Sequence, residues 1–449
     1  MLAALDKSNT RIWILLLGIL FILATSFLAI VPTQSDFPYI ASGFLCCFAI
    51  YYFLFKFPLQ GKELNLLIGA AILARVILVF TFPNFSDDIY RFIWDGHLIN
   101  SGLNPFEYLP KDALAQNVNG LTPQLFELMN SQEYYTIYPP VSQAIFFIST
   151  FFSENWYFSS VVMKIFMLAF EIGSIVYLIK ILALLEQPKK NVLIYALNPL
   201  IIIEIMGNLH FEGAMIFFMM AAYYLLLKSK LTLSGILFGL AVCSKLLPLL
   251  FLPSLFRRIS SDTGSTFWKK LITYYFVVGV TILVCFLPLL SETFFLNFAN
   301  SLDLYFRKFE FNASIYYLLR AIGDQIVGYN LIAWFGPILG ILSLSSILGI
   351  AFYKQKELLQ KWPETLLLTI VVYLLFTTTV HPWYLSLPIV FCCLTSYRFP
   401  MIWSGLICLT YLNYSGPEYH EHLWVVTIEY GMLFGMLVYE YYLGKRVFT

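Results

Sequence analysis

The chain has 449 residues, of which 60% are apolar, 18% are aromatic and only 12% are charged. Soluble globular domains carry about 25% charged residues, so a chain with half that share cannot cover its surface with polar groups. This composition excludes an ordinary cytosolic enzyme, a disordered protein and a nucleic-acid-binding module, and the net charge of +1 points to no dominant basic patch. The sequence therefore predicts a polytopic membrane protein.

Apolar runs long enough to cross a bilayer, which takes about 20 residues, recur along the whole chain. The first run follows Lys7 and Arg11 and is too long for the apolar part of a signal peptide, so we expect an uncleaved span. The stretch 231–256 contains Lys245 and Pro248 and reads as a hairpin of two short helices. We expect one all-α bundle over 1–449 with about 11 to 14 spans. Outside the hairpin, and counting the first run, the expected spans are 12–31, 38–57, 64–82, 157–184, 191–206, 213–228, 268–290, 331–353, 363–379, 384–397, 400–414 and 423–443.

The distribution of charge fixes the expected orientation, because basic residues gather in cytoplasmic loops. With the N-terminus in the cytoplasm, 19 of the 27 basic residues face that side and all five histidines face the other. This topology puts both termini in the cytoplasm and two long loops, 83–156 and 291–330, on the outer face. Those loops are expected to build the active site. We find no P-loop and no G-x-G-x-x-G after a strand, so we expect no nucleotide cofactor.

The most informative stretch is the start of the first outer loop, 83–110. Asp87 and Asp88 stand side by side and precede a short amphipathic helix, which we expect along the membrane interface with its apolar face in lipid. The apolar segment 141–152 is too short to span and is expected to be interfacial or re-entrant. Two interpretations of the acidic pair stay open at this point. One is an N-cap of the following helix, and the other is a carboxylate that acts as a general base at the mouth of a cavity.

An ordered set of motifs extends over most of the chain. It comprises S-D-D-I-Y-R-F-I-W-D-G (86–96), G-x-N-P-F (102–106), Y-P-P (138–140), N-P-L-I-I-I-E (198–204), G-N-L-H-F-E (207–212), G-L-A-V-C-S-K (239–245), F-N-A-S-I-Y (311–316) and H-P-W-Y (381–384). The set resembles the GT-C superfamily of glycosyltransferases, which use polyprenyl-phosphate-linked sugars, and most closely its bacterial branch related to mannosyltransferases. The resemblance implies that an acidic residue of the first outer loop is the catalytic base. That residue is Asp87 or Asp88, and we favour Asp87.

Cationic side chains near the expected outer face are candidates to bind the donor phosphate or its lipid. These are Lys245, Arg91, His210, His381 and Arg75. A lysine at membrane depth needs an anion or a wet cavity, although Lys245 can also snorkel to the surface. Arg75 has the alternative of an ion pair with Glu171 or Glu204. No metal ion is expected in the mechanism, since a phosphate is already a good leaving group.

Polar and aromatic residues of the same motifs are candidates to bind the sugar or the acceptor. They are Asn208, Glu212, Asn104, Tyr138, Asn312, Trp383 and Tyr384. Each has a plainer alternative. The N-x-H-x-E pattern at 208–212 suits a helix cap or, with lower weight, a zinc site. The second outer loop suits a solvated amphipathic helix, and the aromatic residues of 383–384 suit an interfacial belt.

The predicted function is transfer of a single sugar, mannose or another hexose, from a polyprenyl-phosphate donor at the outer face, with inversion. The acceptor is a glycan, a lipid or a protein, and no nucleic acid is involved. The resemblance places the protein in a bacterial inner membrane. A transporter or lipid flippase is the alternative from another class, since it would also explain charges within spans. A polymerase or ligase of lipid-linked oligosaccharides is a third.

Overall fold

The computed structural model describes residues 7–57, 59–256, 258–259, 264–353 and 359–444. Across these ranges the regular structure is helical, and the β-pairing consists of one isolated parallel bridge between Phe311 and Thr379. The chain divides into two compact units. Unit 1 comprises Met1–Ser86, Met167–His210 and His381–Thr449, and unit 2 comprises Asp87–Phe166 and Phe211–Val380.

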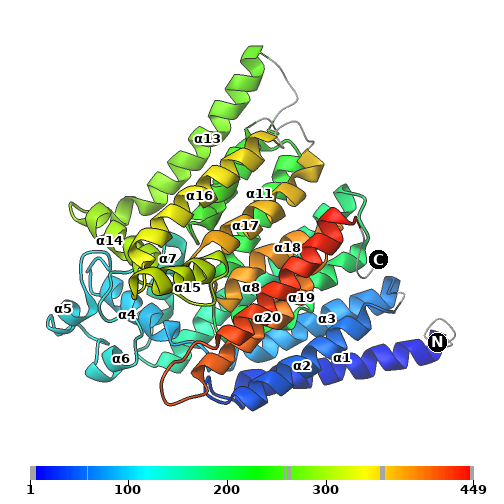
Figure 1. The fold of residues 1–449 in the computed structure, drawn as a ribbon, viewed down its shortest axis with the longest axis horizontal. Helices are drawn as coiled ribbons and strands as arrows, with labels where there is room; N and C mark the ends of the chain where they lie inside the picture. Colours follow the sequence, from blue (N-terminus) through cyan, green and yellow to red (C-terminus); the bar gives the residue numbers. More distant parts are fainter. Residues whose placement is uncertain (1–6, 58, 257, 260–263, 354–358, 445–449) are drawn as a thin grey trace. The chain divides into compact units, whose positions relative to one another are not determined.

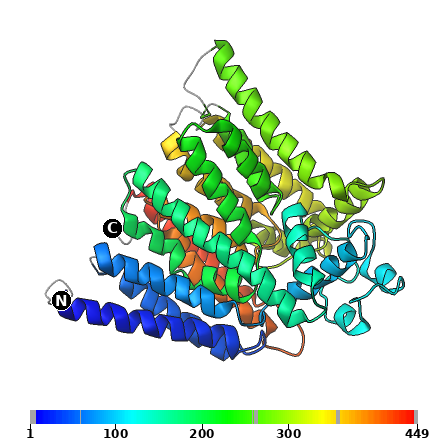
Figure 2. The same cartoon turned by 180° about the vertical axis from the view of Figure 1, so that it is seen from behind.

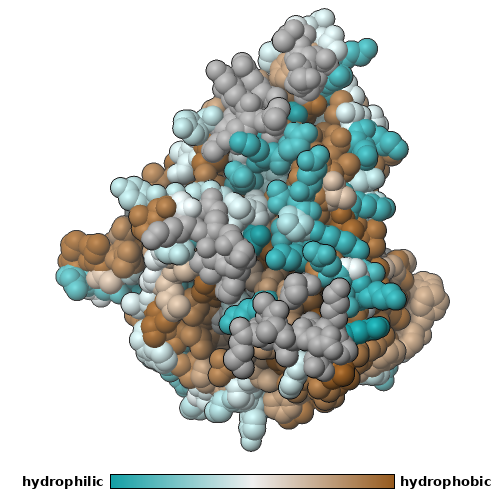
Figure 3. Space-filling view, turned by 90° about the vertical axis from the view of Figure 1, so that its right-hand side faces the viewer, coloured by the Kyte–Doolittle hydropathy of each residue, from teal (hydrophilic) through white to brown (hydrophobic). Residues whose placement is uncertain are grey.

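Seven helices among the described residues are long and apolar enough to cross a membrane. They are Arg11–Ile30, Phe37–Leu54, Trp156–Leu184, Gly264–Leu289, Ile332–Tyr353, Leu359–Phe376 and Leu423–Tyr442. Large apolar side chains on them reach the surface, for example Leu23 (62% exposed) and Phe276 (68%). Broad hydrophobic areas are visible in the space-filling view (Figure 3). An apolar exterior is what helices facing lipid require, so the expected polytopic helical membrane protein is confirmed.

Several of the expected spans form shorter or broken helices. The segments Lys189–Ala196 and Pro199–Gly207 together form an apolar helix pair bent by 49°, either one broken span or a re-entrant loop, which we call the bent span. Four further apolar helices have 10 to 17 residues: Pro140–Phe151, Glu212–Leu227, Leu231–Val242 and Pro382–Cys393. The helix Gly61–Leu78 contains Lys62, Glu63 and Arg75, which lower its apolar character. Helices that are short or broken at membrane depth leave backbone groups to be satisfied by other protein, and this usually marks a cavity or a site.

In unit 1, α1, α2 and α3 run side by side (Figures 1 and 2). The bent span lies in the interior, and every residue from 191 to 210 is buried. Asn198 causes its break, because its side chain accepts hydrogen bonds from the backbone N–H groups of Leu200 and Ile201 while Pro199 starts a new helix. The helices of this unit are α1 (Lys7–Ile30), α2 (Phe37–Leu54), α3 (Gly61–Leu78), the part of α8 (Trp156–Leu184) from Met167 on, η2 (Lys189–Val192), α9 (Leu193–Ala196), α10 (Pro199–Ile201), η3 (Ile202–Gly207), η7 (Pro382–Leu385), α18 (Ser386–Cys393), α19 (Phe399–Leu406), η8 (Ile407–Tyr414), α20 (Leu423–Leu437) and η9 (Val438–Tyr442).

In unit 2, α4 packs against α7, and α12 packs between α11 and α13. Gly96 permits the close approach of α4, because a Cβ there would lie 2.5 Å from the carbonyl oxygen of Phe146. The helices of this unit are α4 (Asp88–Asn100), α5 (Pro110–Leu114), α6 (Pro123–Glu127), α7 (Pro140–Phe151), the part of α8 up to Phe166, α11 (Glu212–Leu227), α12 (Leu231–Val242), η4 (Leu247–Leu255), α13 (Gly264–Phe286), η5 (Leu287–Leu289), α14 (Phe294–Arg307), α15 (Ile315–Val327), α16 (Ile332–Tyr353), η6 (Leu359–Lys361) and α17 (Trp362–Phe376).

The environment of α4 differs from the expectation. The helix begins at Asp88 as predicted, but its apolar residues Ile89, Phe92 and Ile93 are at most 1% exposed. They pack within protein and do not lie in lipid. The partner helix α7 supplies much of the cover, because Phe92 stacks on Phe146 with ring centroids 4.7 Å apart. The acidic pair therefore stands at the start of a helix that protein packing holds in place.

Candidate functional site

The two acidic residues have different surroundings although they are neighbours in the sequence. Asp87 occupies the N-cap position of α4, yet its side chain makes no capping hydrogen bond. Asp88 is the first residue of the helix, and its two carboxylate oxygens accept hydrogen bonds from Asn130 Nδ2 (3.1 Å) and from the hydroxyl of Tyr138 (3.2 Å). The N-cap interpretation therefore has no support from the side chain of Asp87. Asp88 is the carboxylate that its neighbours fix in position.

The protonation of Asp87 differs from that of an ordinary surface carboxyl. The residue keeps an exposed side, but the protein around it removes part of its water, and this burial raises its pKa. The negative charge of Asp88 raises the pKa of Asp87 further. A general base works best when its pKa approaches the operating pH, so both effects favour proton acceptance by Asp87.

Arg91 belongs to a structural network in unit 2. It is 2% exposed, and its Nε lies 2.8 Å from a carboxylate oxygen of Asp95. Its Nη1 donates to the carbonyl oxygens of Ser131 (3.1 Å) and Tyr134 (2.8 Å). Nε and Nη1 of Arg91 thus fasten the loop before Tyr138 to α4, and binding of the donor phosphate by Arg91 stays a prediction.

Asp95 completes the same network from the centre of α4. Its second oxygen accepts hydrogen bonds from Thr136 (2.5 Å) and from Gln143 (2.9 Å), and the residue is fully buried. A buried charge with an ion-pair partner and several donors is stable in this setting, whereas removal of one partner is strongly destabilising. The network fixes the loop that presents Tyr138 to Asp88.

Tyr138 connects the acidic pair to a lysine within unit 2. Its ring packs edge-on against Phe92 and Phe146, which leaves the hydroxyl directed at Asp88. The ammonium of Lys245 lies over the same ring, 5.7 Å from its centre, in the arrangement of a cation–π contact. The start of α7 is tied to the segment before Lys245, because Val141 N–H donates to the carbonyl of Cys243 (2.9 Å). Asp88, Tyr138 and Lys245, which the motifs singled out separately, are thus brought together.

Glu212 is the anionic partner of Lys245, with Nζ and Oε1 3.0 Å apart. The side chain of Glu212 is 1% exposed, so it does not face a sugar as predicted. That of Lys245 remains 23% exposed, which leaves ammonium protons available to a second anion. Neither oxygen of Glu212 makes a well-aligned hydrogen bond to the residues that the structure describes. The pair is therefore held by charge, with little directional support.

A second cluster of predicted residues lies in unit 1, around Glu204. This buried carboxylate accepts hydrogen bonds from Tyr411 (2.5 Å) and from Asn208 Nδ2 (3.3 Å). His210 Nε2 lies 3.2 Å from Glu204 Oε2. The amide oxygen of Asn208 accepts the backbone N–H of Phe85 (3.3 Å). Both ends of the Asn208 side chain thus have protein partners, and no contact here supports its predicted binding of the sugar. Its bond to Phe85 fixes the chain two residues before Asp87.

His210 is stacked on the H-P-W-Y motif. Its ring lies 3.7 Å from that of Trp383, and the ring of His381 also stacks on Trp383 at 4.4 Å. Tyr384 meets His381 edge-on at 5.5 Å. The indole of Trp383, a candidate to bind the sugar, therefore packs on two imidazoles. Through it the structure brings together the cation candidates His210 and His381.

The backbone around this cluster is unusual. Residues Ile202–Gly207 form a π-helix, a form that often occurs at functional sites. Leu209, which is fully buried, has φ +63°, a left-handed conformation that a leucine adopts at a cost of about 1–3 kcal/mol. Such local strain persists only where the surrounding packing enforces it. Here it turns the chain so that His210 faces back toward Glu204.

Arg75 forms a buried ion pair with Glu171. Its Nε lies 2.8 Å from Glu171, with both side chains fully buried, and its Nη1 donates to the carbonyl oxygens of Ala71 and Ala196. Tyr195 donates to the other oxygen of Glu171. The arginine is therefore an internal ion-pair partner, the alternative that the sequence left open, although its Nη2 makes no aligned hydrogen bond to the residues that the structure describes.

Asn104 and Asn312, two of the candidates to bind the sugar or the acceptor, are held by their surroundings in unit 2. Asn104 donates to the carbonyl of Leu289 (2.8 Å) and accepts from the N–H of Phe106 (3.1 Å), so it fastens its loop and is not available to a sugar. Asn312 is fully buried, with φ +47°, next to the β-bridge at Phe311. Among the residues described, no group of three or more His, Cys, Asp or Glu side chains is arranged to hold a metal ion.

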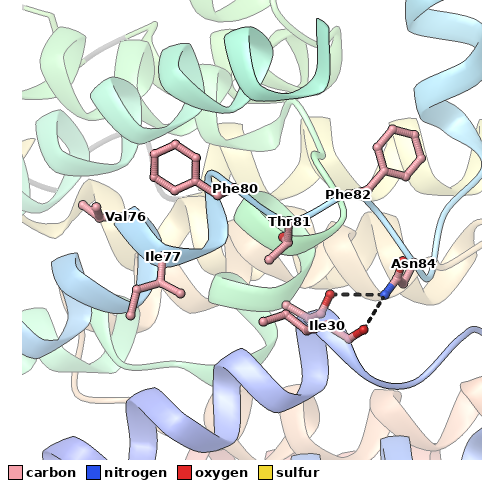
Figure 4. Close-up of a pocket in the computed structure, with 8 residues that line it drawn as sticks. Ile30, Val76, Ile77, Phe80, Thr81, Phe82 and Asn84 are labelled. Atoms are coloured by element: carbon pink, nitrogen blue, oxygen red, sulfur yellow. Dashed lines mark hydrogen bonds between the residues drawn. The ribbon is translucent and has the colours of Figure 1, made fainter. Parts of the chain in front are cut away.

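An apolar pocket of about 580 Å³ lies in unit 1 at the ends of α1 and α3 (Figure 4). Asn84 belongs to the lining, and its amide donates to the carbonyl oxygens of Ala29 (3.2 Å) and Ile30 (3.4 Å) at the end of α1. The lining ends three residues before Asp87 in the sequence. It consists of Ala29, Ile30, Val76, Ile77, Phe80, Thr81, Phe82 and Asn84. Apart from Thr81 and Asn84, these residues offer only hydrocarbon.

Comparison with known proteins identifies the family. The family model described as "Alpha-(1->6)-mannopyranosyltransferase, N-terminal domain" matches residues 26–259, which is more than half of the chain. The chain belongs to this mannosyltransferase family. It is also 28% identical over 173 residues to GPI mannosyltransferase 1 of Kluyveromyces lactis, an alignment that covers 37% of this chain and 39% of that protein. The chain thus aligns with well under half the length of this relative.

The chain is thus a polytopic helical membrane protein of this mannosyltransferase family. The matched range of the mannosyltransferase family includes Asp87, Asp88, Glu212 and Lys245. The H-P-W-Y motif lies beyond it.

Several site residues escaped prediction from the sequence. Tyr411 and Asn130 reach Glu204 and Asp88 across 207 and 42 residues, and no local pattern marks them. Asp95 carries a signal, because it stands four residues after Arg91, the spacing of a helical ion pair. Glu204 was named only as a possible partner of Arg75, and its π-helical setting could not be read from the sequence.

Proposed function

We propose that this glycosyltransferase moves a single mannosyl residue from a polyprenyl-phosphate donor to an acceptor hydroxyl, with inversion at the anomeric carbon. The observation that carries the proposal is the difference between the two acids. Asp87 stands at a rigid helix start with no capping bond and a raised pKa, and Asp88 beside it is held by Asn130 and Tyr138. We assign Asp87 as the base and Asp88 as its positioning neighbour.

In this mechanism Asp87 accepts the proton of the acceptor hydroxyl. The acceptor oxygen forms a bond to the anomeric carbon while the bond from that carbon to the phosphate oxygen breaks on the opposite side. The polyprenyl phosphate leaves with the electron pair, and cations near the departing oxygen stabilise its charge. We favour Lys245 and His210 over Arg75 and Arg91, because the two arginines are paired with the buried carboxylates of Glu171 and Asp95. His381, stacked with His210 on Trp383, is a weaker one.

The names of the family and of the relative support mannose as the sugar. A lipid-linked donor is supported by the apolar pocket, whose lining ends three residues before Asp87 in the sequence. We assign the pocket at the ends of α1 and α3 to the first part of the donor's isoprenoid chain. A pocket of about 580 Å³ with a mostly hydrocarbon lining suits an alkyl ligand. We further propose that Asp87 faces the outer side of a bacterial inner membrane, with both termini in the cytoplasm; the sorting of basic residues supports this orientation.

The central experiment measures transfer by the purified full chain. It uses polyprenyl-phosphate mannose as donor, octyl mannoside as acceptor probe and the nucleotide sugar as a competing donor. We expect Asp87→Asn to lose at least 1000-fold in rate, on the order of the effect of an essential base, and Asp88→Asn to lose less. Asp112→Asn, an exposed acid of the same loop, is the matched control. Full activity of Asp87→Asn would refute the base, and transfer from the nucleotide sugar alone would refute the donor class.

A second experiment tests the pocket. Ile77→Trp fills it, and Ile19→Trp places the same bulk on the exposed face of α1 outside it. We expect Ile77→Trp to raise KM for a long-chain donor at least fivefold while KM for a short, two-isoprene donor stays within twofold. An equal effect on both donors, or the same effect from Ile19→Trp, would show that the pocket does not hold the chain.

A further inference from the structure

The carboxylate of Glu204 lies within unit 1 at a place where a negative charge needs compensation. It is 1% exposed. Two of the groups in contact with it, the hydroxyl of Tyr411 and the amide of Asn208, are neutral donors. The third, His210, is the one of these three that can carry a positive charge, and its Nε2 lies 3.2 Å from the carboxylate. Glu204 and His210 are thus in direct contact.

The chain is built to create this contact. Residues six apart on a regular α-helix point in different directions, because each residue turns by about 100°. The π-helix over Ile202–Gly207 and the left-handed Leu209 change that course, and the N–H of His210 returns to the carbonyl oxygen of Glu204 (3.1 Å). The imidazole is consequently placed beside a carboxylate from its own segment.

The two sides of the His210 ring have different partners. The face of the ring stacks on Trp383, and the Nε2 edge meets Glu204. Nε2 makes no aligned hydrogen bond among the described residues, so the contact with Glu204 is one of charge and shape. Tyr411 and Asn208 in turn fix the carboxylate, so the position of the ring depends on groups that His210 itself does not touch.

We propose that Glu204 is the positioning residue of His210. Its carboxylate, fixed by Tyr411 and Asn208, holds the imidazole against Trp383 in the orientation from which His210 meets the donor phosphate. This role toward the phosphate rests on the proposed function, whereas the coupling of Glu204 to His210 does not. The role is new to Glu204, which touches neither sugar nor phosphate in this scheme.

The coupling is tested first without any substrate. Protein labelled with ¹⁵N-histidine contains five histidines, and His210→Gln identifies the signals of His210. We expect the ring ¹⁵N shifts of His210 to move in Glu204→Gln and to move less in Tyr411→Phe. Glu429→Gln is the matched control, because Glu429 is an equally buried carboxylate of unit 1 that accepts from Trp403 Nε1 (2.7 Å). Unchanged His210 signals in Glu204→Gln would overturn the proposal.

The kinetic test separates positioning from general support of the fold. In Glu204→Gln we expect KM for polyprenyl-phosphate mannose to rise at least tenfold while kcat per folded molecule stays within threefold. Tyr411→Phe should raise the same KM by two- to fivefold, and Glu429→Gln should leave it unchanged. If the wild type transfers from this donor and Glu204→Gln keeps a normal KM, the inference fails and the proposed function stands. If the wild type does not use the donor, the proposed function fails and the NMR result still decides the coupling.

Discussion

Two buried ion pairs of this protein contain the same charges but are completed differently. In unit 1, Arg75 and Glu171 are both fully enclosed. The arginine donates to two carbonyl oxygens besides the carboxylate, and Tyr195 donates to the other oxygen of Glu171. In unit 2, Glu212 is enclosed, whereas Lys245 keeps 23% of its side chain exposed. We call the first pair the closed pair, because protein encloses both side chains, although Nη2 of Arg75 makes no aligned hydrogen bond among the described residues. We call the second the open pair, because Lys245 is partly exposed.

The enclosed pair contains an arginine, and the partly exposed pair contains a lysine. A guanidinium presents several donors in a fixed fork, which suits a site where every partner is protein. An ammonium is a compact charge that can turn between partners, which suits a site where a ligand arrives and leaves. A closed pair is expected to serve the fold, and an open pair to serve the reaction. This difference separates Lys245 from Arg75, which the sequence analysis had both named as candidates to bind the donor phosphate.

The largest expected effect is on activity at the open pair. Lys245→Met removes the exposed ammonium, and we expect kcat/KM for polyprenyl-phosphate mannose to fall by about 100- to 1000-fold, as for other preorganised groups that stabilise a developing charge. Lys111→Met is the control, because Lys111 is an exposed lysine in a loose pair with Glu133. Rates are measured per folded molecule after gel filtration. A normal rate for Lys245→Met would remove the lysine from the mechanism.

The closed pair is expected to show the reverse behaviour. Arg75→Met leaves Glu171 enclosed without its cation, which costs about 3–5 kcal/mol of stability. The thermal midpoint in detergent should fall, as it should in Lys245→Met, which leaves the enclosed carboxylate of Glu212 without its cation. Activity per folded molecule should stay within about threefold of the wild type. A large loss of specific activity in Arg75→Met would show that the pair is not purely structural.

A double substitution sharpens the comparison at the open pair. Lys245→Met strands the carboxylate of Glu212, and Glu212→Gln in the same chain removes that stranded charge. We expect the double variant to recover about 1–2 kcal/mol of the lost stability, because an unpaired buried charge is worse than none. The transfer rate should stay as low as in the single variant. Recovery of both properties together would mean that the ammonium serves only the fold.

The sequence predicted the polytopic helical class correctly, because this class depends on local patterns, but it predicted 11 to 14 spans where seven described helices, or up to eight with the bent pair, are long and apolar enough. Long apolar runs specify helices in lipid, and Asp87–Asp88 mark a helix start by composition alone. The environment of each polar residue was harder to predict. Arg91 looked available from its position, but Asp95 one turn later already indicated a pair. Nothing local indicated that Lys245 would meet Glu212, 33 residues earlier, since helix packing creates that contact.

The region around Glu204 shows a second limit of sequence-based prediction. A periodicity argument assumes regular helices, and Glu204 and His210 lie on a π-helix that ends in a left-handed leucine. Only packing that is non-local can stabilise such a backbone. The sequence does contain a hint, in that N-P-L-I-I-I-E places a carboxylate inside an apolar run, where an unpaired charge would be costly.

The smallest expected effect concerns pH and the connection from the open pair through Tyr138 to the acidic pair. Asp87 acts as a base only when it is unprotonated, so activity is lost as the pH falls through its pKa, which burial and the charge of Asp88 raise. Asp88→Asn removes the second of these causes, and the acid limb of the kcat/KM profile should move to lower pH while burial keeps it above that of an ordinary carboxyl. Asp88→Glu keeps the charge and should leave the limb near its original position. The closed pair has no such connection, so Arg75→Lys should not move the limb at all. If Asp88→Asn left the profile unshifted, the base would have to be a group other than Asp87.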